Sequence, residues 1–267
     1  MIRLILIMMI AVSPAWAETI TLASTTSVDN SGLLARILPA FTRASGIEVR
    51  VIAQGTGQAL ATAARGDADL VLVHDPDAEA AFIAAGHGIL RREIAWNDFL
   101  LVGPKSDHAR IAGSHDAMAA LRAVAATASA FVSRGDKSGT DAAEKRLWKS
   151  AGIDPVGQDW YRDIGGGMGA ALNAAAALGG VVLTDRGTWL SFSNRQDLVA
   201  LVEGDPAFVN RYDVIQLNPA THPGARLDAA RQLAEWLAGP QGQHEIGAMT
   251  LGGEQLFHPD ADRPLGS

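Results

Sequence analysis

The chain has 267 residues, no cysteine and a formal net charge of −7, from 22 basic and 29 acidic side chains. This length suits one large domain or two lobes with an ample hydrophobic core. An acidic chain without a basic run is a poor nucleic-acid binder. The lack of cysteine excludes disulfides and thiolate metal sites, so stability must come from the packed core.

The first 17 residues have the pattern of a secretory signal peptide rather than of an N-terminal membrane anchor. Arg3 supplies a short positive region, Leu4 to Val12 an apolar core, and Ala15-Trp16-Ala17 a cleavage site of the small-x-small type. Cleavage after Ala17 would leave 250 residues (267 − 17), with no cysteine for lipid attachment. We therefore expect a periplasmic protein.

Apolar extended runs then alternate with alanine-rich helical runs, which is typical of a parallel α/β sheet. The first part predicts strands at 19–25, 47–54, 68–74 and 92–104, and helices at 31–46, 55–66 and 75–86. Pro39 should kink or end the first of these helices. The pattern begins again with helices at 116–129, 139–152 and 167–180, strands at 130–133 and 181–186, and a helix-like stretch at 187–194. The last part predicts a strand at 212–219 and helices at 225–239 and 239–249.

Two such α/β units, with the tail returning to the first, predict two lobes joined by two crossing segments. We expect residues 18–102 and 214–267 to form lobe 1 and residues 103–213 to form lobe 2. The crossings are expected near Gly103 and near residues 203–213. Each lobe would hold a mostly parallel sheet flanked by helices.

Four loops rich in hydroxyls or glycine stand between predicted strands and helices. They are Ser24 to Ser27, Gly55 to Gly57, Ser133 to Thr140, and Gly165 to Gly169. In open α/β sheets, ligands bind outside the carboxyl ends of the strands, where helix N-termini offer N–H groups to anions. Arg134 adds a planar fork that can engage two oxygens of an oxyanion. The loops together predict a small-anion site, although each alone could be a helix cap and Arg134 could pair with Asp136 or Asp141 at the surface.

Three rival sites have weaker support. Gly165, Gly167 and Ala170, with Asp185 twenty residues beyond the first glycine, imitate a dinucleotide fingerprint, but the preceding QDWYRDI is a polar stretch rather than an apolar strand. An exported hydrolase would need a nucleophile elbow, and no histidine spacing indicates a metal cation site. His74 ends a predicted strand and could face the cleft or be a hydrogen-bonded core residue.

The chain resembles the periplasmic tungstate-binding proteins of ABC transporters, within the type II solute-binding fold. The resemblance covers nearly all of the chain after residue 17 and rests on STTSVDNSGLL, GTGQALATAARGDADLVLVH, WNDFLLVGP, FVSRGDKSGT, GGGMGAALNAA, VLTDRGTWL, VIQLNP and GEQLFHP. It implies a two-lobed α/β receptor, not an enzyme, that closes on tungstate or molybdate and delivers it to a membrane permease with its ATPase. We expect no cofactor and a monomer.

The loops and the resemblance together predict ligand contacts from both lobes. The expected residues are Thr25, Thr26, Ser27, Thr56, Gly57, Ser133, Arg134, Ser138, Gly139 and Thr140, with Ser24, His74, Gly167 and Met168 as further candidates. The family usually has a third threonine where this chain has Ser24, which keeps a hydroxyl at that place.

Phosphate is the main competing ligand, because phosphate-binding relatives have a similar Arg-x-x-x-Ser-Gly-Thr spacing. Phosphate carries a proton near neutral pH and benefits from a carboxylate acceptor, which would repel fully deprotonated tungstate. We expect the cleft to lack an inward carboxylate, with His74 at that place although Asp75 follows it. A sensory role, in which a membrane partner reads the closed receptor, and the choice between tungstate and molybdate both stay open.

Overall fold

The computed structural model describes residues 18–261. The predicted signal peptide and its cleavage site lie outside these residues. Among the residues that are described, no helix is long and apolar enough to cross a membrane.

Lobe 1 is built on three parallel strands with β1 in the middle: β2 (Glu48–Gln54), β1 (Thr19–Thr25) and β3 (Leu70–Val73). Its helices are α1 (Thr26–Asn30), α2 (Leu33–Ser45), α3 (Thr56–Ala64), α4 (Pro76–Ala84), α9 (Leu227–Ala238) and α10 (Pro240–Gly247). The apolar face of α2, including Leu33, Ile37 and Phe41, packs into one core with buried residues of α9 and α10. The C-terminal helices therefore complete the lobe that the N-terminus begins.

Lobe 2 repeats this plan with the parallel strands β7 (Val181–Asp185), β5 (Phe131–Ser133) and β6 (Tyr161–Asp163). Around them lie α5 (Ala117–Ala126), α6 (Gly139–Ser150), α7 (Met168–Leu178), α8 (Arg186–Ser191), strand β8 (Leu198–Val202) and a short 3₁₀ turn (Pro206–Phe208). Phe131 and Trp148 are fully buried at its centre, with their rings 5.0 Å apart in an edge-to-face arrangement.

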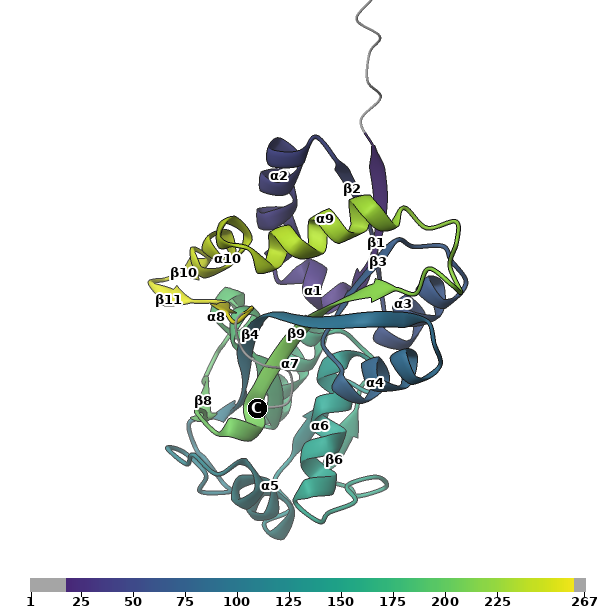
Figure 1. The fold of residues 1–267 in the computed structure, drawn as a ribbon. Helices are drawn as coiled ribbons and strands as arrows, with labels where there is room; N and C mark the ends of the chain where they lie inside the picture. Colours follow the sequence, from purple (N-terminus) through teal and green to yellow (C-terminus); the bar gives the residue numbers. More distant parts are fainter. Residues whose placement is uncertain (1–17, 262–267) are drawn as a thin grey trace, which may run out of the picture.

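The two lobes share a pair of long antiparallel strands, β4 (Gly88–Pro104) and β9 (Val209–Leu217). They join the two parallel sets into one sheet of order β2-β1-β3-β9-β4-β7-β5-β6, with β8 and β12 (His258–Pro259) also paired to β4. A small hairpin of β10 (Thr250–Leu251) and β11 (Glu254–Gln255) stands apart. Figure 1 shows β4 and β9 running from one lobe to the other. This two-lobed α/β architecture confirms the predicted fold class.

The hydrophobic cores divide along these crossing strands. On β4, Ile94 and Ala95 belong to a core of lobe 1, whereas Phe99 belongs to a core of lobe 2. On the return path, Phe208 packs in lobe 2 and Tyr212 in lobe 1. This division favours crossings at residues 96–98 and 209–211, so the first would lie before the predicted point near Gly103; the predicted lobe boundaries stay predictions.

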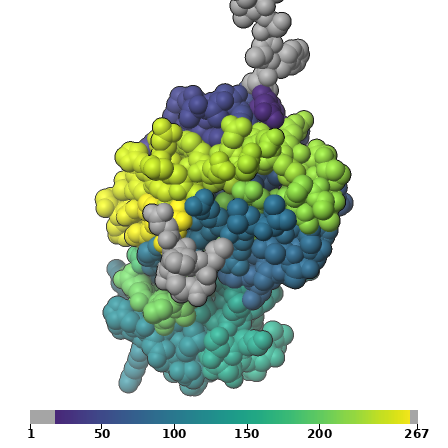
Figure 2. All heavy atoms as spheres, viewed as in Figure 1, coloured from purple at the N-terminus to yellow at the C-terminus, as the bar shows by residue number. Residues whose placement is uncertain are grey.

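The overall shape is that of two masses, one above the other (Figure 2). The upper mass contains both the purple N-terminal and the yellow C-terminal parts of the described chain. The lower mass is built from the teal middle of the sequence. The described C-terminal part of the chain therefore lies beside the N-terminal part in the upper mass.

Three local expectations differ from the structure. Pro39 lies within α2, which runs unbroken from Leu33 to Ser45 instead of ending there. Strand β8 was not expected, and neither was β6, which falls within the polar QDWYRDI stretch. Strand β6 lies at the edge of the sheet and pairs with β5 through its backbone, and Arg162 and Asp163 are exposed there. An edge strand of this kind needs no apolar alternation, so hydrophobic pattern alone could not reveal it.

The Trp148→Ala variant should lose about 3–5 kcal/mol of unfolding free energy, because the substitution opens a cavity in the centre of lobe 2. Urea denaturation of the wild type and the variant measures this loss. Val156→Ala is the control, since Val156 is 73% exposed and should change stability by less than about 0.5 kcal/mol. A loss below about 1 kcal/mol for Trp148→Ala would contradict this account of the core.

Candidate functional site

The carboxyl edge of the lobe 1 sheet brings the first hydroxyl loop beside the end of β3. Ser24 pairs in register with Leu72, and its Oγ donates to the Leu72 carbonyl at 2.8 Å. Its single proton is therefore used inside the sheet and is not available to a ligand. Thr25 Oγ1 accepts the Val28 N–H at 3.1 Å and caps α1, so its own proton remains free to donate.

The next residues of these loops differ in exposure. The hydroxyl oxygens of Ser27 and Thr56 are fully buried and have no hydrogen-bond partner among the described residues. Thr26 and Gly57 are exposed. Because unsatisfied buried hydroxyls cost free energy, Ser27 and Thr56 are the stronger ligand candidates of this lobe.

In lobe 2, the second group of candidates follows β5, where two chain segments approach very closely. The Ile164 N–H donates to Ser133 O at 3.1 Å and the Gly166 N–H donates to Arg134 O at 2.9 Å. Gly135 has φ of +61°, and a Cβ at this residue would lie 1.5 Å from Asp163 Oδ1. Only glycine fits there, which holds the Arg134 loop against the glycine loop before α7.

Arg134 is buried, with 6% of its surface exposed. Its Nε donates to Asp136 Oδ2 at 3.2 Å, and its Nη2 contacts the same oxygen. Asp136 Oδ1 also accepts the Ser138 N–H. Burial alone would raise the pKa of Asp136, but hydrogen bonds from Ser138 and Arg134 and the charge of Arg134 outweigh burial and hold that pKa below its usual value. The pairing of Arg134 with Asp136 weighed from the sequence therefore exists, but in the interior instead of at the surface.

Two helices of lobe 2 begin at this same edge. Ser138 caps α6 by accepting the Asp141 N–H at 3.3 Å, and Gly139 and Thr140 form its first, buried turn. Helix α7 begins after Gly167, which provides no side-chain cap. Such N-termini present unpaired N–H groups and a partial positive charge. Met168 packs in a hydrophobic core, so its side chain has a packing role.

The two loop groups meet across the lobe boundary. A Cβ at Gly139 would lie 2.3 Å from His74 Cε1, so the ring of His74 rests on the start of α6. A Cβ at Gly55 would lie 3.9 Å from the carbonyl oxygen of Lys137. The lobes are therefore in contact at the start of α6, where His74 of lobe 1 meets Gly139 of lobe 2, and again where Gly55 approaches Lys137.

His74 occupies the centre of this junction and is held from the crossing strands. Its Nδ1 lies 3.0 Å from Asn210 Oδ1 on β9, and its ring stacks on Tyr212 with centroids 5.2 Å apart. Asn210 in turn contacts Asn97 of β4. Burial lowers the pKa of His74; the Asn210 hydrogen bond, Asp185 and Asp75 oppose this shift, and Arg134 adds to it.

Asn97, Asn210 and Tyr212 were not predicted as part of the site. The available signal was a buried polar residue inside each extended run, in WNDF and in VNRYD. Such residues need a partner, and here they provide one for each other and for His74.

Two carboxylates near the junction accept from protein donors, whereas Oδ1 of Asp141, in the first turn of α6, is buried without a partner among the described residues. Asp75 Oδ1 accepts from Arg146 Nη1 at 3.0 Å and caps α4 through the Ala78 N–H at 3.5 Å. Asp185 accepts from the backbone and the hydroxyl of Thr188, at 2.9 and 2.7 Å. These oxygens are committed to helix caps and an ion pair. In residues 18–261 no group of three or more His, Cys, Asp or Glu side chains could hold a metal ion.

Ser133 lies beside a buried, hydrogen-bonded pair formed by Tyr161 and Glu144. Tyr161 OH donates to Glu144 Oε1 at 2.6 Å. Burial raises the pKa of Glu144 to about 7, and the Tyr161 and Ser133 hydroxyls reduce this shift. The Ser133 hydroxyl is itself buried, lies beside this pair, and makes no hydrogen bond of good geometry in the part of the chain that is described.

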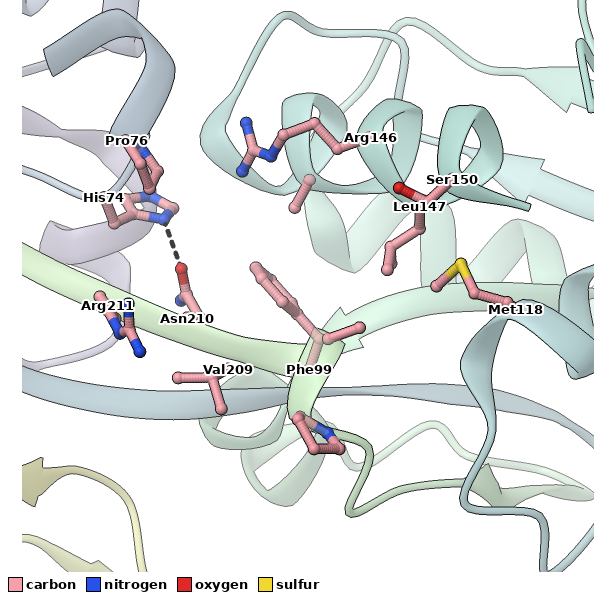
Figure 3. Close-up of a pocket in the computed structure, with 13 residues that line it drawn as sticks. His74, Pro76, Phe99, Met118, Arg146, Leu147, Ser150, Val209, Asn210 and Arg211 are labelled. Atoms are coloured by element: carbon pink, nitrogen blue, oxygen red, sulfur yellow. Dashed lines mark hydrogen bonds between the residues drawn. The ribbon is translucent and has the colours of Figure 1, made fainter. Parts of the chain in front are cut away.

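A cavity of about 410 Å³ is lined in part by His74 and Asn210 (Figure 3). Phe99, Met118 and Leu147 supply apolar walls, and Arg146 and Arg211 reach it from α6 and β9. Both arginines are already paired, Arg146 with Asp75 across the lobes at 3.0 Å and Arg211 with Glu93 at 3.5 Å. Their charges are balanced, as is that of Arg134, and Ser150 is the only hydroxyl residue among the described residues of the lining, so this cavity offers an anion fewer hydroxyl donors than the loops do.

Comparison with known proteins shows the superfamily and the family to which the chain belongs. Residues 12–241 match the PBP superfamily domain, and the chain is a two-lobed binding protein of that superfamily. It is 40% identical over 247 residues to the tungstate-binding protein TupA of Peptoclostridium acidaminophilum, covering 91% of this chain and 86% of that protein. The chain belongs to the TupA family, which confirms the resemblance read from its motifs.

Two solved structures of similar proteins support this family assignment. The tungstate-binding protein TupA from Desulfovibrio alaskensis G20 superposes with a TM-score of 0.83 at 43% identity, covering 92% of this chain and 100% of that one. The structure described as the tungstate ABC transporter from Geobacter sulfurreducens has a TM-score of 0.78 at 42% identity, covering 87% and 99%.

The Glu144→Gln variant should change how stability depends on pH. Glu144 has a pKa of about 7 in the folded protein against 4.5 for an unperturbed group, so folding favours its protonated form. The stabilising contribution of Glu144 to the folded state is complete below pH 4.5 and is lost as the pH rises to about 7. Above pH 7 the variant should therefore be more stable than the wild type by up to about 3 kcal/mol, with no difference below pH 4.5.

Urea denaturation from pH 4 to pH 8 measures this difference. Glu235→Gln, at an exposed residue of α9, is the matched control and should follow the wild-type curve. Parallel curves for Glu144→Gln and wild type would show that Glu144 ionises freely in the fold.

Proposed function

We propose that this protein is the solute-binding component of a tungstate ABC transporter. It would capture the oxyanion between its lobes and present it to a membrane permease that works with an ATPase. A periplasmic location follows from the signal-peptide pattern of residues 1–17. The proposal includes no enzymatic activity.

One observation carries the proposal. Ser27 and Thr56 bury hydroxyl oxygens without hydrogen-bond partners among the described residues, and Thr56 follows Gly55, where lobe 1 approaches Lys137 of lobe 2. A fold tolerates several such groups together when a ligand satisfies them. The relatives named as tungstate-binding proteins identify the expected ligand.

The anion would be held mainly by neutral donors. Thr25, Ser27 and Thr56 would donate from hydroxyl groups, and the first turns of α6 and α7 would donate from backbone N–H groups. Arg134 would add its Nη1, which donates no hydrogen bond to the described residues, whereas Nε and Nη2 both contact Asp136. Because Asp136 already balances the charge of Arg134, geometry and enclosure would contribute more than net charge.

The same arrangement disfavours phosphate. Near neutral pH phosphate carries a proton that needs an acceptor; both Asp185 oxygens and Oδ1 of Asp75 already accept from protein donors, which leaves Oδ1 of Asp141 as the buried acceptor that phosphate would need. Tungstate has no proton to place. Tungstate and molybdate have the same charge and nearly the same size, so we expect both to bind.

Calorimetric titration of the mature protein with tungstate, molybdate, phosphate and sulfate in one buffer tests the function. Tight binding of tungstate with no heat from phosphate supports it. Phosphate binding alone would reassign the receptor, and no binding of any of the four would refute an oxyanion receptor.

Arg134→Ala should weaken tungstate binding at least about 100-fold, because a buried, charge-assisted donor is lost and Asp136 remains without its partner. Arg162→Ala, at an exposed residue of β6, is the matched control and should bind as the wild type does. Near-normal binding by a folded Arg134→Ala variant would remove Arg134 from the site.

Gly139→Ala should weaken tungstate binding at least about tenfold, or about 1.4 kcal/mol. The added methyl would overlap the His74 ring and keep the lobes from closing, while each lobe still folds. Gly224→Ala is the control, because a Cβ at Gly224 meets no atom within 4 Å. Unchanged binding by Gly139→Ala would mean that the bound form does not use this contact.

A further inference from the structure

The tautomer of His74 follows from a chain of buried amides. Asn210 Nδ2 donates to Asn97 Oδ1 and to Tyr212 OH, both at 2.8 Å. The amide oxygen of Asn210 therefore faces His74 and accepts from Nδ1 at 3.0 Å. A neutral His74 that donates from Nδ1 must have a lone pair, not a proton, on Nε2.

That Nε2 atom faces the proposed site. It is fully buried and has no hydrogen-bond partner among the described residues. A Cβ at Gly139 would lie 2.7 Å from it, so Nε2 lies at the first turn of α6, between Ser138 and Thr140. Here a lone pair would repel the oxygen of a deprotonated anion, whereas an N–H would donate to it.

The groups around the ring act on the pKa of His74 in opposite directions. Asp75 and Asp185 favour the protonated form of His74, whereas Arg134 and burial oppose it, and Tyr212 stacks on the ring without adding charge. Burial is the largest of these effects and lowers the pKa of His74, which favours the neutral ring. A doubly charged oxyanion in the junction would add negative charge and offset Arg134, which favours the imidazolium.

We propose that His74 takes up one proton when the anion binds, so that its Nε2–H donates to the bound oxyanion. The proton comes from solvent, and Nδ1 keeps its hydrogen bond to Asn210 throughout. This inference rests on the proposed function. It adds a specificity-determining donor that exists only in the complex, and it couples capture of the anion to pH.

The affinity for tungstate should then rise as the pH falls, by up to about tenfold per pH unit between the His74 pKa of the complex and that of the free protein. The test is calorimetry with tungstate at about pH 7.5 in two buffers with different heats of ionisation, such as Tris and HEPES. The dependence of the observed heat on the buffer gives the protons exchanged, and we expect an uptake close to one per tungstate.

Two variants identify the group that takes up the proton. His74→Asn cannot titrate, and its proton uptake should fall to near zero while tungstate binds at least about tenfold more weakly. His244→Asn, at an exposed histidine of α10, should keep the wild-type uptake. Uptake that persists in His74→Asn would overturn the proposal.

A second measurement covers the case in which His74→Asn does not fold. In the wild type labelled with ¹⁵N-histidine, tungstate should move the Nε2 resonance of His74 from the value of a neutral acceptor to that of an imidazolium.

Binding of tungstate by the wild type without proton uptake would overturn the inference alone. It would mean that both asparagine amides are rotated and that neutral His74 donates from Nε2. No binding of tungstate at all would instead refute the proposed function and this inference with it.

Discussion

The antiparallel pairing of β4 with β9 is the interaction on which the rest of the structure depends. Through it the chain passes between the lobes twice, and the hydrophobic cores divide on either side of residues 96–98 and 209–211. The pairing of Asn97 with Asn210 lies at the middle of this crossing. The crossing strands β4 and β9 therefore also carry Asn97 and Asn210, the hydrogen-bonded amides that position His74. The connection between the lobes and the proposed site therefore share the same few residues.

The proposed site balances its charges before any ligand arrives. Asp136 pairs with Arg134, Arg146 pairs with Asp75, and the Thr188 hydroxyl donates a hydrogen bond to Asp185. Among the described residues, the buried atoms without a partner around this site include the Ser27 and Thr56 hydroxyls, Nε2 of His74, Nδ2 of Asn97 and Oδ1 of Asp141. A junction of this kind would select an anion by the number and direction of its hydrogen bonds, because unpaired buried donors are costly and a wrong anion leaves some unpaired.

Much of this was accessible from the sequence. Alternating apolar and helical runs predicted the α/β class, and the motifs around Ser27 and Arg134 predicted the family. Strand β6 was not predicted because an edge strand can be polar. Helix α2 runs through Pro39, which shows that a proline need not end a helix whose apolar face is well packed. The hydroxyl loops looked equivalent in sequence, yet Ser24 is consumed by Leu72 and Thr26 is exposed. Exposure depends on contacts with distant segments, which local pattern does not contain.

The sequence by itself determined which local elements form and which donors stand at their ends, since propensity, capping and hydrophobic periodicity act over a few residues. Only the tertiary structure decided which of those donors face one another. It placed Gly139 against His74 across 65 residues of chain (139 − 74), and it linked His74 to Asn210 and Asn97 from two other strands. The protonation of His74 is a property of that assembly, because it depends on burial and on the orientation of an amide that lies far away in the sequence.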